Sequence, residues 1–381
     1  FGDLAEGHSG RLLIAQAAAG QPPADAVLHL GDIAGNLSDE DSQRGDRFIE
    51  MLQPLASRVP YLTLPGDRDD LPAYHQFFHM PCNGSGAASP WYAFNLGQAR
   101  VVTLWTDALL DGGGDGARQL EWLQKELADF AASAAAEPRS RRPWLVVAGH
   151  RPLYCSMQQP TCGPEAEKLR EVLEPLFHEY EVDLYLSAHV HAYERTYPVF
   201  NKTLCPHQPR KSLRVLRRPC APVYVVNGAA GEPLLQYDER FLPATWTAQR
   251  NAGSASYGEL IVHNLTHLQY RQVGVAGAVI DEFWLQHPRG ASGDGGNGAE
   301  GEEEDFLEAV WWLALLTAVV GGSMGFVRWV HADGIKRRDR ALQELGVELS
   351  VLTGMPLPVF GSRAEARSLA GDRGDPSGGL H

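Results

Sequence analysis

The chain has 381 residues, of which 44% are hydrophobic, so it can form one large α/β domain with additional segments. Its formal net charge of −14 argues against a general nucleic-acid-binding surface. A basic run at residues 209–218 is expected to be a solvated loop, and a nucleic-acid site is the less favoured interpretation. Nucleic acid is therefore not expected among the partners.

Apolar strands and helical patterns alternate along the first half of the chain. Strands are predicted at 26–31, 60–65, 100–105, 144–148 and 182–187, and helices at 43–57, 118–134 and 164–179. This alternation predicts parallel strands covered by helices. A second strand series at 222–227 and 258–273 predicts a second sheet stacked on the first. The predicted fold is a four-layer α/β/β/α sandwich.

Residues that commonly bind metals follow the ends of these strands and open the chain. In chain order they are Asp3, Asp32, Asp67, His150, His189 and His191. Ligands in open α/β sheets gather at the carboxyl ends of strands, so these side chains are expected to meet at one edge. A single carboxylate after a strand is often only a cap or turn residue. Five such places, the last a His-x-His pair, favour a metal centre.

The residue types restrict the metal. Carboxylate oxygens and imidazole nitrogens suit Zn, Fe and Mn, and no cysteine follows these strands, so a thiolate site is not indicated. Two ions held about 3.5–4 Å apart can lower the pKa of a water and clamp an in-line phosphoryl displacement. Such a pair needs one bridging carboxylate. Asp32 is the expected bridge, because it follows a buried central strand.

The motifs occur in a fixed order: Gly2-Asp3-Leu4, Gly31-Asp32, Gly66-Asp67, Gly149-His150 and the segment 188–195. Together they resemble the motifs of the purple acid phosphatases, of the animal iron/zinc type, within the calcineurin-like metallophosphoesterase superfamily. The resemblance covers about residues 1–288, with the family's C-terminal part at about 222–288. It implies two metal ions, Fe and Zn or Mn, and hydrolysis of a phosphate monoester by a metal-bound hydroxide.

The resemblance also implies which residues bind each ion. Site one would take Asp3, Asp32 and His191. Site two would share Asp32 and add the imidazoles of His150 and His189. The carboxylate of Asp67 would be a substitute ligand in the same site.

Two of the motifs depart from the family pattern. Gly35 stands where the family has a tyrosine that binds iron and gives the purple colour, and Asp67-Arg68 stands where it has Asn-His. Three anionic ligands remain, but one has moved from site one to site two, so site one is expected to hold a ferric ion poorly. Arg68 can bind phosphate oxygens with both arms of its guanidinium. Alternatively, it pairs with Asp67 or Asp69 in a decayed centre.

The sequence therefore favours a dinuclear-metal acid phosphatase with Arg68, His150 and His189 as catalytic residues. Glu194 or Asp69 is expected to orient waters. The alternative is a catalytically weakened ectodomain that binds a phosphorylated ligand or a protein partner. A phosphodiesterase of the same superfamily is a third reading, and the Tyr-Glu-Arg after His-x-His argues for the acid phosphatase branch. The oligomeric state is left open.

Cysteines and glycosylation triplets favour an oxidising compartment. Spacing makes two disulfides plausible and leaves Cys82 over, while free buried thiols are the alternative. The pairs would be Cys155 with Cys162 and Cys205 with Cys220. Four Asn-x-Ser/Thr triplets predict glycosylated surface loops in a secreted chain. They are at Asn36, Asn83, Asn201 and Asn264.

The composition changes after residue 288. Residues 289–305 are acidic and Gly-rich, which is typical of a flexible linker. Residues 309–327 carry no charge and are long enough to cross a bilayer, so a transmembrane helix is predicted within 306–330. A buried core helix is disfavoured because the segment has no amphipathic face. Basic residues follow it, which places a largely disordered tail, 331–381, in the cytoplasm.

These features predict a single-pass membrane protein of the secretory pathway. Its phosphatase-like domain would lie outside the cell or in a lumen. The chain begins with Phe1, inside the first motif, and is therefore expected to be a fragment of a longer protein.

Overall fold

The computed structural model describes residues 1–287, apart from 21, 83–88, 158, 207–213 and 236–241. The predicted linker, membrane segment and tail lie outside the described residues and stay predictions. Within the described ranges, no helix is both long and apolar enough to cross a membrane.

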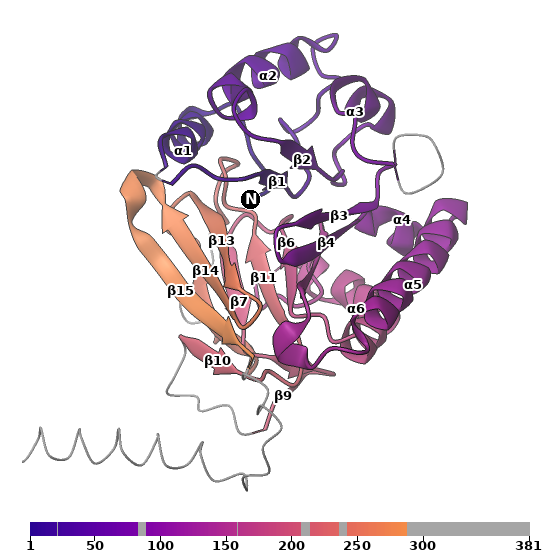
Figure 1. Ribbon diagram of the computed structural model, residues 1–381. Coiled ribbons are helices and arrows are strands. Elements are labelled where there is room, and N and C mark those ends of the chain that lie inside the picture. The colour runs from indigo at the N-terminus through magenta and orange to yellow at the C-terminus, as the bar shows by residue number, and fades with distance from the viewer. Residues whose placement is uncertain (21, 83–88, 158, 207–213, 236–241, 288–381) are drawn as a thin grey trace, which may run out of the picture. The chain divides into compact units, whose positions relative to one another are not determined.

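A seven-stranded mixed sheet forms the centre of the domain (Figure 1). Its order is β12 (Thr247–Asn251), β7 (Tyr193–Thr196), β11 (Val223–Asn227), β6 (Leu184–Ser187), β5 (Trp144–Gly149), β4 (Ala99–Leu104) and β3 (Tyr92–Leu96). The interior strands β4, β5, β6 and β11 are parallel, as predicted. Strands β3, β7 and β12, which the sequence analysis did not predict, pair antiparallel, so the sheet as a whole is mixed.

Three helices cover one face of this sheet. They are α4 (Thr106–Asp111), α5 (Gly114–Ala134) and α6 (Pro164–Glu179). In α5, Leu123 and Leu127 are four residues apart, so they lie on one face of the helix, and both are fully buried. They pack in one cluster with Leu145 and Val147 of β5. Because side chains alternate along a strand, Val146 points to the opposite face of the sheet.

That opposite face packs against a second, four-stranded sheet. Its order is β10 (Val215–Arg217), β15 (Val279–Gln286), β14 (His267–Gly274) and β13 (Ser256–Asn264). Tyr270 of β14 and Phe283 of β15 lie in the same buried cluster as Val146. The expected stacking of two sheets is therefore confirmed. The predicted strand 258–273 is instead a hairpin of β13 and β14, and β11 belongs to the first sheet.

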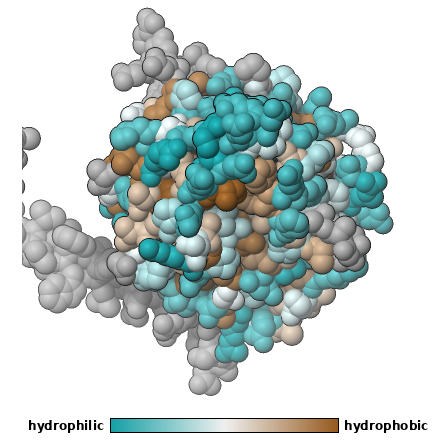
Figure 2. Space-filling model, turned by 90° about the horizontal axis from the view of Figure 1, so that it is seen from above, coloured by the Kyte–Doolittle hydropathy of each residue, from teal (hydrophilic) through white to brown (hydrophobic). Residues whose placement is uncertain are grey.

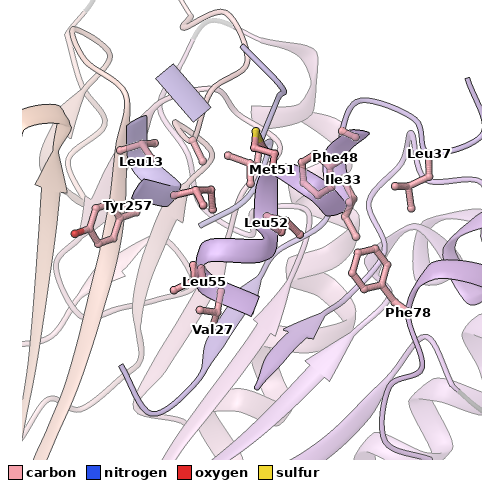
Figure 3. Close-up of a cluster of buried hydrophobic side chains, with 14 of the residues drawn as sticks. Leu13, Val27, Ile33, Leu37, Phe48, Met51, Leu52, Leu55, Phe78 and Tyr257 are labelled. Atoms are coloured by element: carbon pink, nitrogen blue, oxygen red, sulfur yellow. The ribbon is translucent and has the colours of Figure 1, made fainter. Parts of the chain in front are cut away.

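A smaller layer carries the first site residues. The parallel pair β1 (Val27–His29) and β2 (Tyr61–Thr63) lies beneath the helices α1 (His8–Ala19), α2 (Gln43–Ala56) and α3 (Leu71–Phe77). Buried residues of α2 recur every three to four positions and pack against β1 and α1 (Figure 3). The surface seen from above is mostly hydrophilic, with small separate apolar areas (Figure 2). A short hairpin of β8 (Val199–Phe200) and β9 (Thr203–Leu204) completes the described strands.

Both predicted disulfides are present. Cα–Cα distances are 5.2 Å for Cys155–Cys162 and 5.7 Å for Cys205–Cys220, and Cys82 is free and exposed. Among the asparagines of the glycosylation triplets, Asn201 and Asn264 are the exposed ones, Asn36 is half-buried, and Asn83 lies outside the described residues. Their glycosylation stays a prediction.

Candidate metal centre

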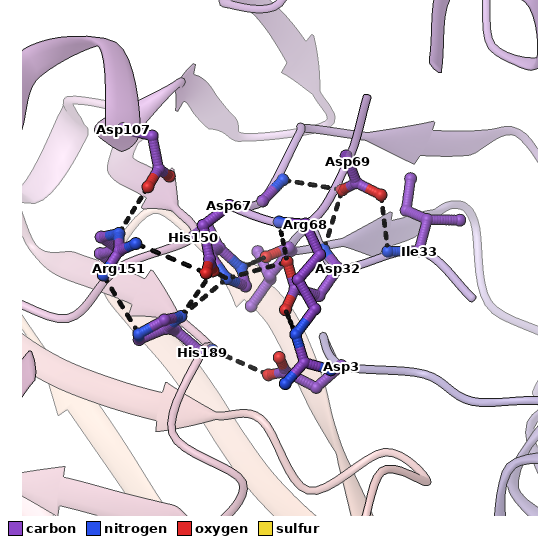
Figure 4. A network of polar contacts seen from close by, with 12 residues as sticks. Asp3, Asp32, Ile33, Asp67, Arg68, Asp69, Asp107, His150, Arg151 and His189 are labelled. Carbon is purple, nitrogen blue, oxygen red and sulfur yellow. Dashed lines mark hydrogen bonds and ion pairs between the residues drawn. The ribbon is translucent and has the colours of Figure 1, made fainter. Parts of the chain in front are cut away.

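The carboxyl ends of four strands bring the predicted residues together (Figure 4). The parallel register of β1 and β2 sets Asp32 level with Gly66, beside Asp67. Beyond the ends of β5 and β6, the backbone N–H of Ala188 donates to the carbonyl of His150 at 2.8 Å. The His-x-His loop therefore begins next to His150, and all four loops face the same space.

Glycines allow these loops to approach one another closely. A Cβ on Gly66 would lie 2.2 Å from Oδ1 of Asp32, and a Cβ on Gly228 would lie 2.5 Å from Oδ2 of Asp3. Backbone atoms are as close: the added Cβ would lie 2.5 Å from Asp32 N at Gly66 and 2.4 Å from the carbonyl oxygen of Val190 at Gly228, so neither position can carry a side chain unless the backbone moves as well. The small residues in these motifs therefore set how near each backbone comes to the acidic groups.

Four of the predicted residues form one tight cluster. One ligand atom from each of them lies within 4.8 Å of the others. Nε2 of His150 is 2.9 Å from Oδ1 of Asp67 and 3.1 Å from Nδ1 of His189. The same Asp67 oxygen is 2.8 Å from Nδ1 of His189. With Asp32, whose Oδ1 is 3.3 Å from Nε2 of His150, this is the set predicted for site two.

Backbone carbonyls fix which nitrogen faces the site in two of the histidines. Nδ1 of His150 donates to the carbonyl of Leu30 at 2.8 Å, and Nδ1 of His191 donates to the carbonyl of Pro233 at 3.0 Å. A carbonyl oxygen only accepts, so Nδ1 carries a proton, and Nε2 is the nitrogen that would bind a metal after losing its own proton. Metal-binding histidines commonly hold their outer nitrogen in this way.

Asp3 shows that a cation fits the second half of the site. It is fully buried, and its Oδ2 accepts a hydrogen bond from the backbone N–H of His189 at 2.8 Å. Within the part of the chain that the structure describes, its Oδ1 accepts no hydrogen bond, and it lies 3.6 Å from Nε2 of His191. Leaving a buried carboxylate oxygen unpaired is costly. A metal ion between Asp3, Asp32 and His191 would remove that cost, so these residues fit site one.

The acidic groups give the site a strongly negative potential. The pKa of His150 is raised to about 10; burial would lower it, but the charges of Asp32 and Asp67 outweigh burial. The pKa of His191 is also raised, because Asp3 outweighs the effect of burial. Burial and the charges of Asp3 and Asp67 raise the pKa of Asp32 itself. Such a potential favours a cation in the space between these groups.

Asp67 is the ligand candidate that replaces an asparagine of the family. Burial would raise its pKa, but hydrogen bonds from His150 and His189 outweigh burial and hold the pKa well below its usual range. Asp67 is therefore ionised at any working pH. Its side chain is 29% exposed, so the carboxylate faces the open side of the site.

Asp69 and Glu194, which the sequence analysis expected to orient waters, both accept hydrogen bonds from groups of the protein. Asp69 accepts hydrogen bonds from the backbone N–H groups of Asp32, Ile33 and Gly66 at 2.8–2.9 Å, and burial raises its pKa to about 7. Glu194 accepts from Ser156 N–H and from the hydroxyl of Thr247, both at 2.7 Å. Asp69 thus ties the Asp32 loop to the Asp67 loop. Glu194 ties β7 to the segment after His150.

Arg68 lies over the open side of the cluster. Its Nε is 3.6 Å from Oδ2 of Asp32, and its Nη1 is 3.7 Å from Oε1 of Glu232. The sequence suggested pairing with Asp67 or Asp69, and the structure shows these other partners instead. About half of the side chain is exposed, so the guanidinium can reach a molecule that enters from solvent.

Arg151 is a site residue that the sequence analysis did not identify as functional. It contacts Asp107 and Glu165, both at 2.5 Å, and Oδ2 of Asp67 at 3.5 Å. Its Nη1 also lies 3.2 Å from Nε2 of His189. Metal binding through Nδ1 of His189 needs a proton on Nε2, so Arg151 must then shift towards its two other carboxylates. The only sequence signal was its place after His150.

The residues that follow His-x-His fasten the loop to the second sheet. The hydroxyl of Tyr193 donates to Oδ2 of Asp281 in β15 at 2.7 Å, and Nε of Arg195 donates to the same oxygen at 2.6 Å. Both side chains are buried. Their contribution to the site is therefore positional.

Known proteins are similar to this chain in sequence and in fold. A calcineurin-like phosphoesterase family model matches residues 1–193, and an iron/zinc purple acid phosphatase-like protein C model matches 221–282. Human acid phosphatase type 7 is 34% identical over 284 residues, which cover 69% of this chain and 61% of the human protein. Zebrafish (Danio rerio) acid phosphatase type 7 is 33% identical over 307 residues, covering 75% of this chain and 67% of the zebrafish protein.

A solved purple acid phosphatase from yellow lupin (Lupinus luteus) seeds has the same fold. Its TM-score is 0.62 at 22% identity, over 75% of this chain and 53% of the lupin chain. The chain studied here spans 61% of the length of its human relative. The first family model alone covers more than half of the 381 residues. The chain therefore belongs to the purple acid phosphatase family of calcineurin-like phosphoesterases.

Proposed function

We propose that this chain is a dinuclear-metal acid phosphatase that hydrolyses phosphate monoesters. The observation that supports it most is the four-residue cluster around His150, next to the unpaired buried oxygen of Asp3, on a purple acid phosphatase fold. When bound, two metal ions would supply a water of lowered pKa and neutralise charge on the phosphate. Fe and Zn, or Mn, are the proposed metals, because the donors are carboxylates and imidazoles.

In this proposal each residue of the chain has a distinct role. Asp32 is central, since its carboxylate approaches both the His150 side and the Arg68 side. Arg68 binds a phosphate oxygen at the open side, because guanidinium matches phosphate geometry and this one is half exposed. His150 and His189 hold site two at the positions that their loops fix.

Rebuilding the family pattern separates a working site from a decayed one. We compare the native chain with a triple variant, Asp67→Asn, Arg68→His and Gly35→Tyr, for metal content and turnover of an aryl phosphate monoester. We expect the native chain to turn over substrate and the triple variant to lose activity, because Asp67 and Arg68 compensate each other's charge. A decayed site predicts the reverse, a gain above tenfold, or more than about 1.4 kcal/mol of barrier.

The structure requires one control in this comparison. Gly35 has a φ of 79°, in the left-handed region, so tyrosine there carries backbone strain of about 1–3 kcal/mol. The double variant without the Gly35 change removes that ambiguity. If neither native nor rebuilt chains hydrolyse the ester although metal is bound, the phosphatase proposal fails. The weakened ectodomain that binds a phosphorylated ligand or a partner then stands.

The protein should be colourless. The family's colour comes from a tyrosinate bound to iron, and Gly35 offers no phenolate. We therefore expect no strong visible absorption band from the purified protein, even when elemental analysis finds two metal ions per chain. A visible band like that of the coloured relatives would show that another tyrosine reaches the metal.

We also propose that residues 309–327 anchor the phosphatase domain to a membrane of the secretory pathway, on its lumenal or extracellular side. Two disulfides support an oxidising compartment. A chain ending at Glu304 should be released in soluble form, while the full chain should stay with membranes after carbonate extraction. Recovery of the full chain in the aqueous phase would contradict the anchor.

A further inference from the structure

The segment after the glycine-rich turn 228–231 is bonded to both residues that are specific to site one. The backbone N–H of Glu232 donates to the carbonyl of Asp3 at 3.1 Å. The carbonyl of the next residue, Pro233, accepts from the imidazole of His191 at 3.0 Å. Leu235 N–H then donates to the carbonyl of His191 at 2.9 Å. Glu232 is therefore fixed between Asp3 and His191 through its own backbone.

The carboxylate of Glu232 lies on the site side of this segment. Its Oε1 is 3.7 Å from Nη1 of Arg68, and its charge acts on the imidazole of His191. A Cβ on Gly35 would lie 3.5 Å from the same oxygen. The carboxylate thus lies within contact distance of the place where a side chain at position 35 would begin, and the Glu232 side chain is only 16% exposed. Within the described residues, the oxygens of Glu232 accept no hydrogen bond.

Site one needs another donor. Asp3, Asp32 and His191 provide only three ligands, and one oxygen of Asp3 is buried without a hydrogen bond. Carboxylate oxygen is a preferred donor for Mn and for other hard ions. We propose that Glu232 is a metal ligand of site one and supplies the anionic oxygen that Gly35 cannot. The inference rests on the proposed dinuclear centre.

Arg68 pairs with two carboxylates of this site. Its guanidinium bridges Asp32 and Glu232, so a positive charge already lies beside both carboxylates. A metal ion in site one would replace that charge and leave Arg68 free to bind phosphate. The competing explanation is that Glu232 only holds Arg68 in place and never binds the metal. The two explanations differ when Arg68 is absent.

The experiment is a metal titration of the metal-free full chain in detergent. Mn²⁺ is added and the number of sites and their affinities are measured calorimetrically for the native chain, Glu232→Gln, Arg68→Gln and the double variant. We expect two sites in the native chain. Glu232→Gln should weaken one of them by at least about tenfold, since even outer residues of a metal site cost that much. The loss should persist in the Arg68→Gln background.

Glu126→Gln is the matched control. Glu126 is an ion-paired glutamate of similar exposure, 19%, bonded to Arg100 on the far side of the domain. It should leave both affinities unchanged, and thermal unfolding checks that each variant is folded. If Glu232→Gln has two sites of unchanged affinity, the role of Glu232 is overturned and the dinuclear centre is not. A loss that vanishes without Arg68 would also overturn it. Fewer than two sites in the native chain would overturn the dinuclear centre as well.

Discussion

Replacing Asp32 with asparagine should abolish most phosphatase activity and the binding of one metal ion. Asp32 is almost fully buried, and its two oxygens face different sides: Oδ1 lies 3.3 Å from Nε2 of His150, and Oδ2 lies 3.6 Å from Nε of Arg68. An amide keeps only one donor oxygen and no charge, so it cannot bridge two ions. We expect kcat/KM to fall at least a thousandfold, equivalent to about 4 kcal/mol.

Asp70→Asn provides an isosteric control in the neighbouring loop. Asp70 caps α3 by accepting from Ala73 N–H at 3.2 Å, and asparagine caps a helix equally well. Its turnover and metal content should match the native protein. If Asp32→Asn keeps native turnover with two bound ions, then another group bridges them and the assignment of Asp32 is wrong.

The strand and helix pattern predicted the centre of the fold well because its strands are buried on both faces. The helices predicted at 43–57 and 164–179 correspond closely to α2 and α6. Strand β7, which lies between β12 and β11, was missed, because its four residues, 193–196, had been interpreted only as part of a metal motif. Helix α1 was missed as well, since its run of alanines gives little amphipathic signal.

The site was predictable where a ligand follows a strand directly. His150 follows β5 and Asp67 follows β2, and although these strands belong to two different sheets, both end at the same space. Glu232 and Arg151 could not be placed in this way, since their positions depend on how loops fold back onto the site. Glu232 follows a turn whose path is set by close contacts, such as that between Gly228 and Asp3. Sequence spacing carries no information about such contacts.

Replacing Asp281 with asparagine should destabilise the whole domain although the residue lies outside the site. Its carboxylate accepts from Tyr193 at 2.7 Å and from two nitrogens of Arg195 at 2.6 and 3.2 Å. Arg195 is 1% exposed and also lies over the ring of Phe283, 4.6 Å from its centroid. The variant would leave this guanidinium buried without a counter-charge. We expect a loss of about 4 kcal/mol in the free energy of unfolding.

Thermal unfolding measures this effect, and the expected fall in Tm is about 8 to 16 °C for a domain of this size. Glu282→Gln is the control: its side chain, half-buried on the other face of β15, accepts from Gln269 at 2.7 Å, and the change should cost less than about 0.5 kcal/mol. The His-x-His loop precedes Tyr193 directly, so Asp281→Asn should also weaken metal binding through His191. An unchanged Tm would mean that packing alone holds the loop, and the ion pair would then have no part in positioning the site.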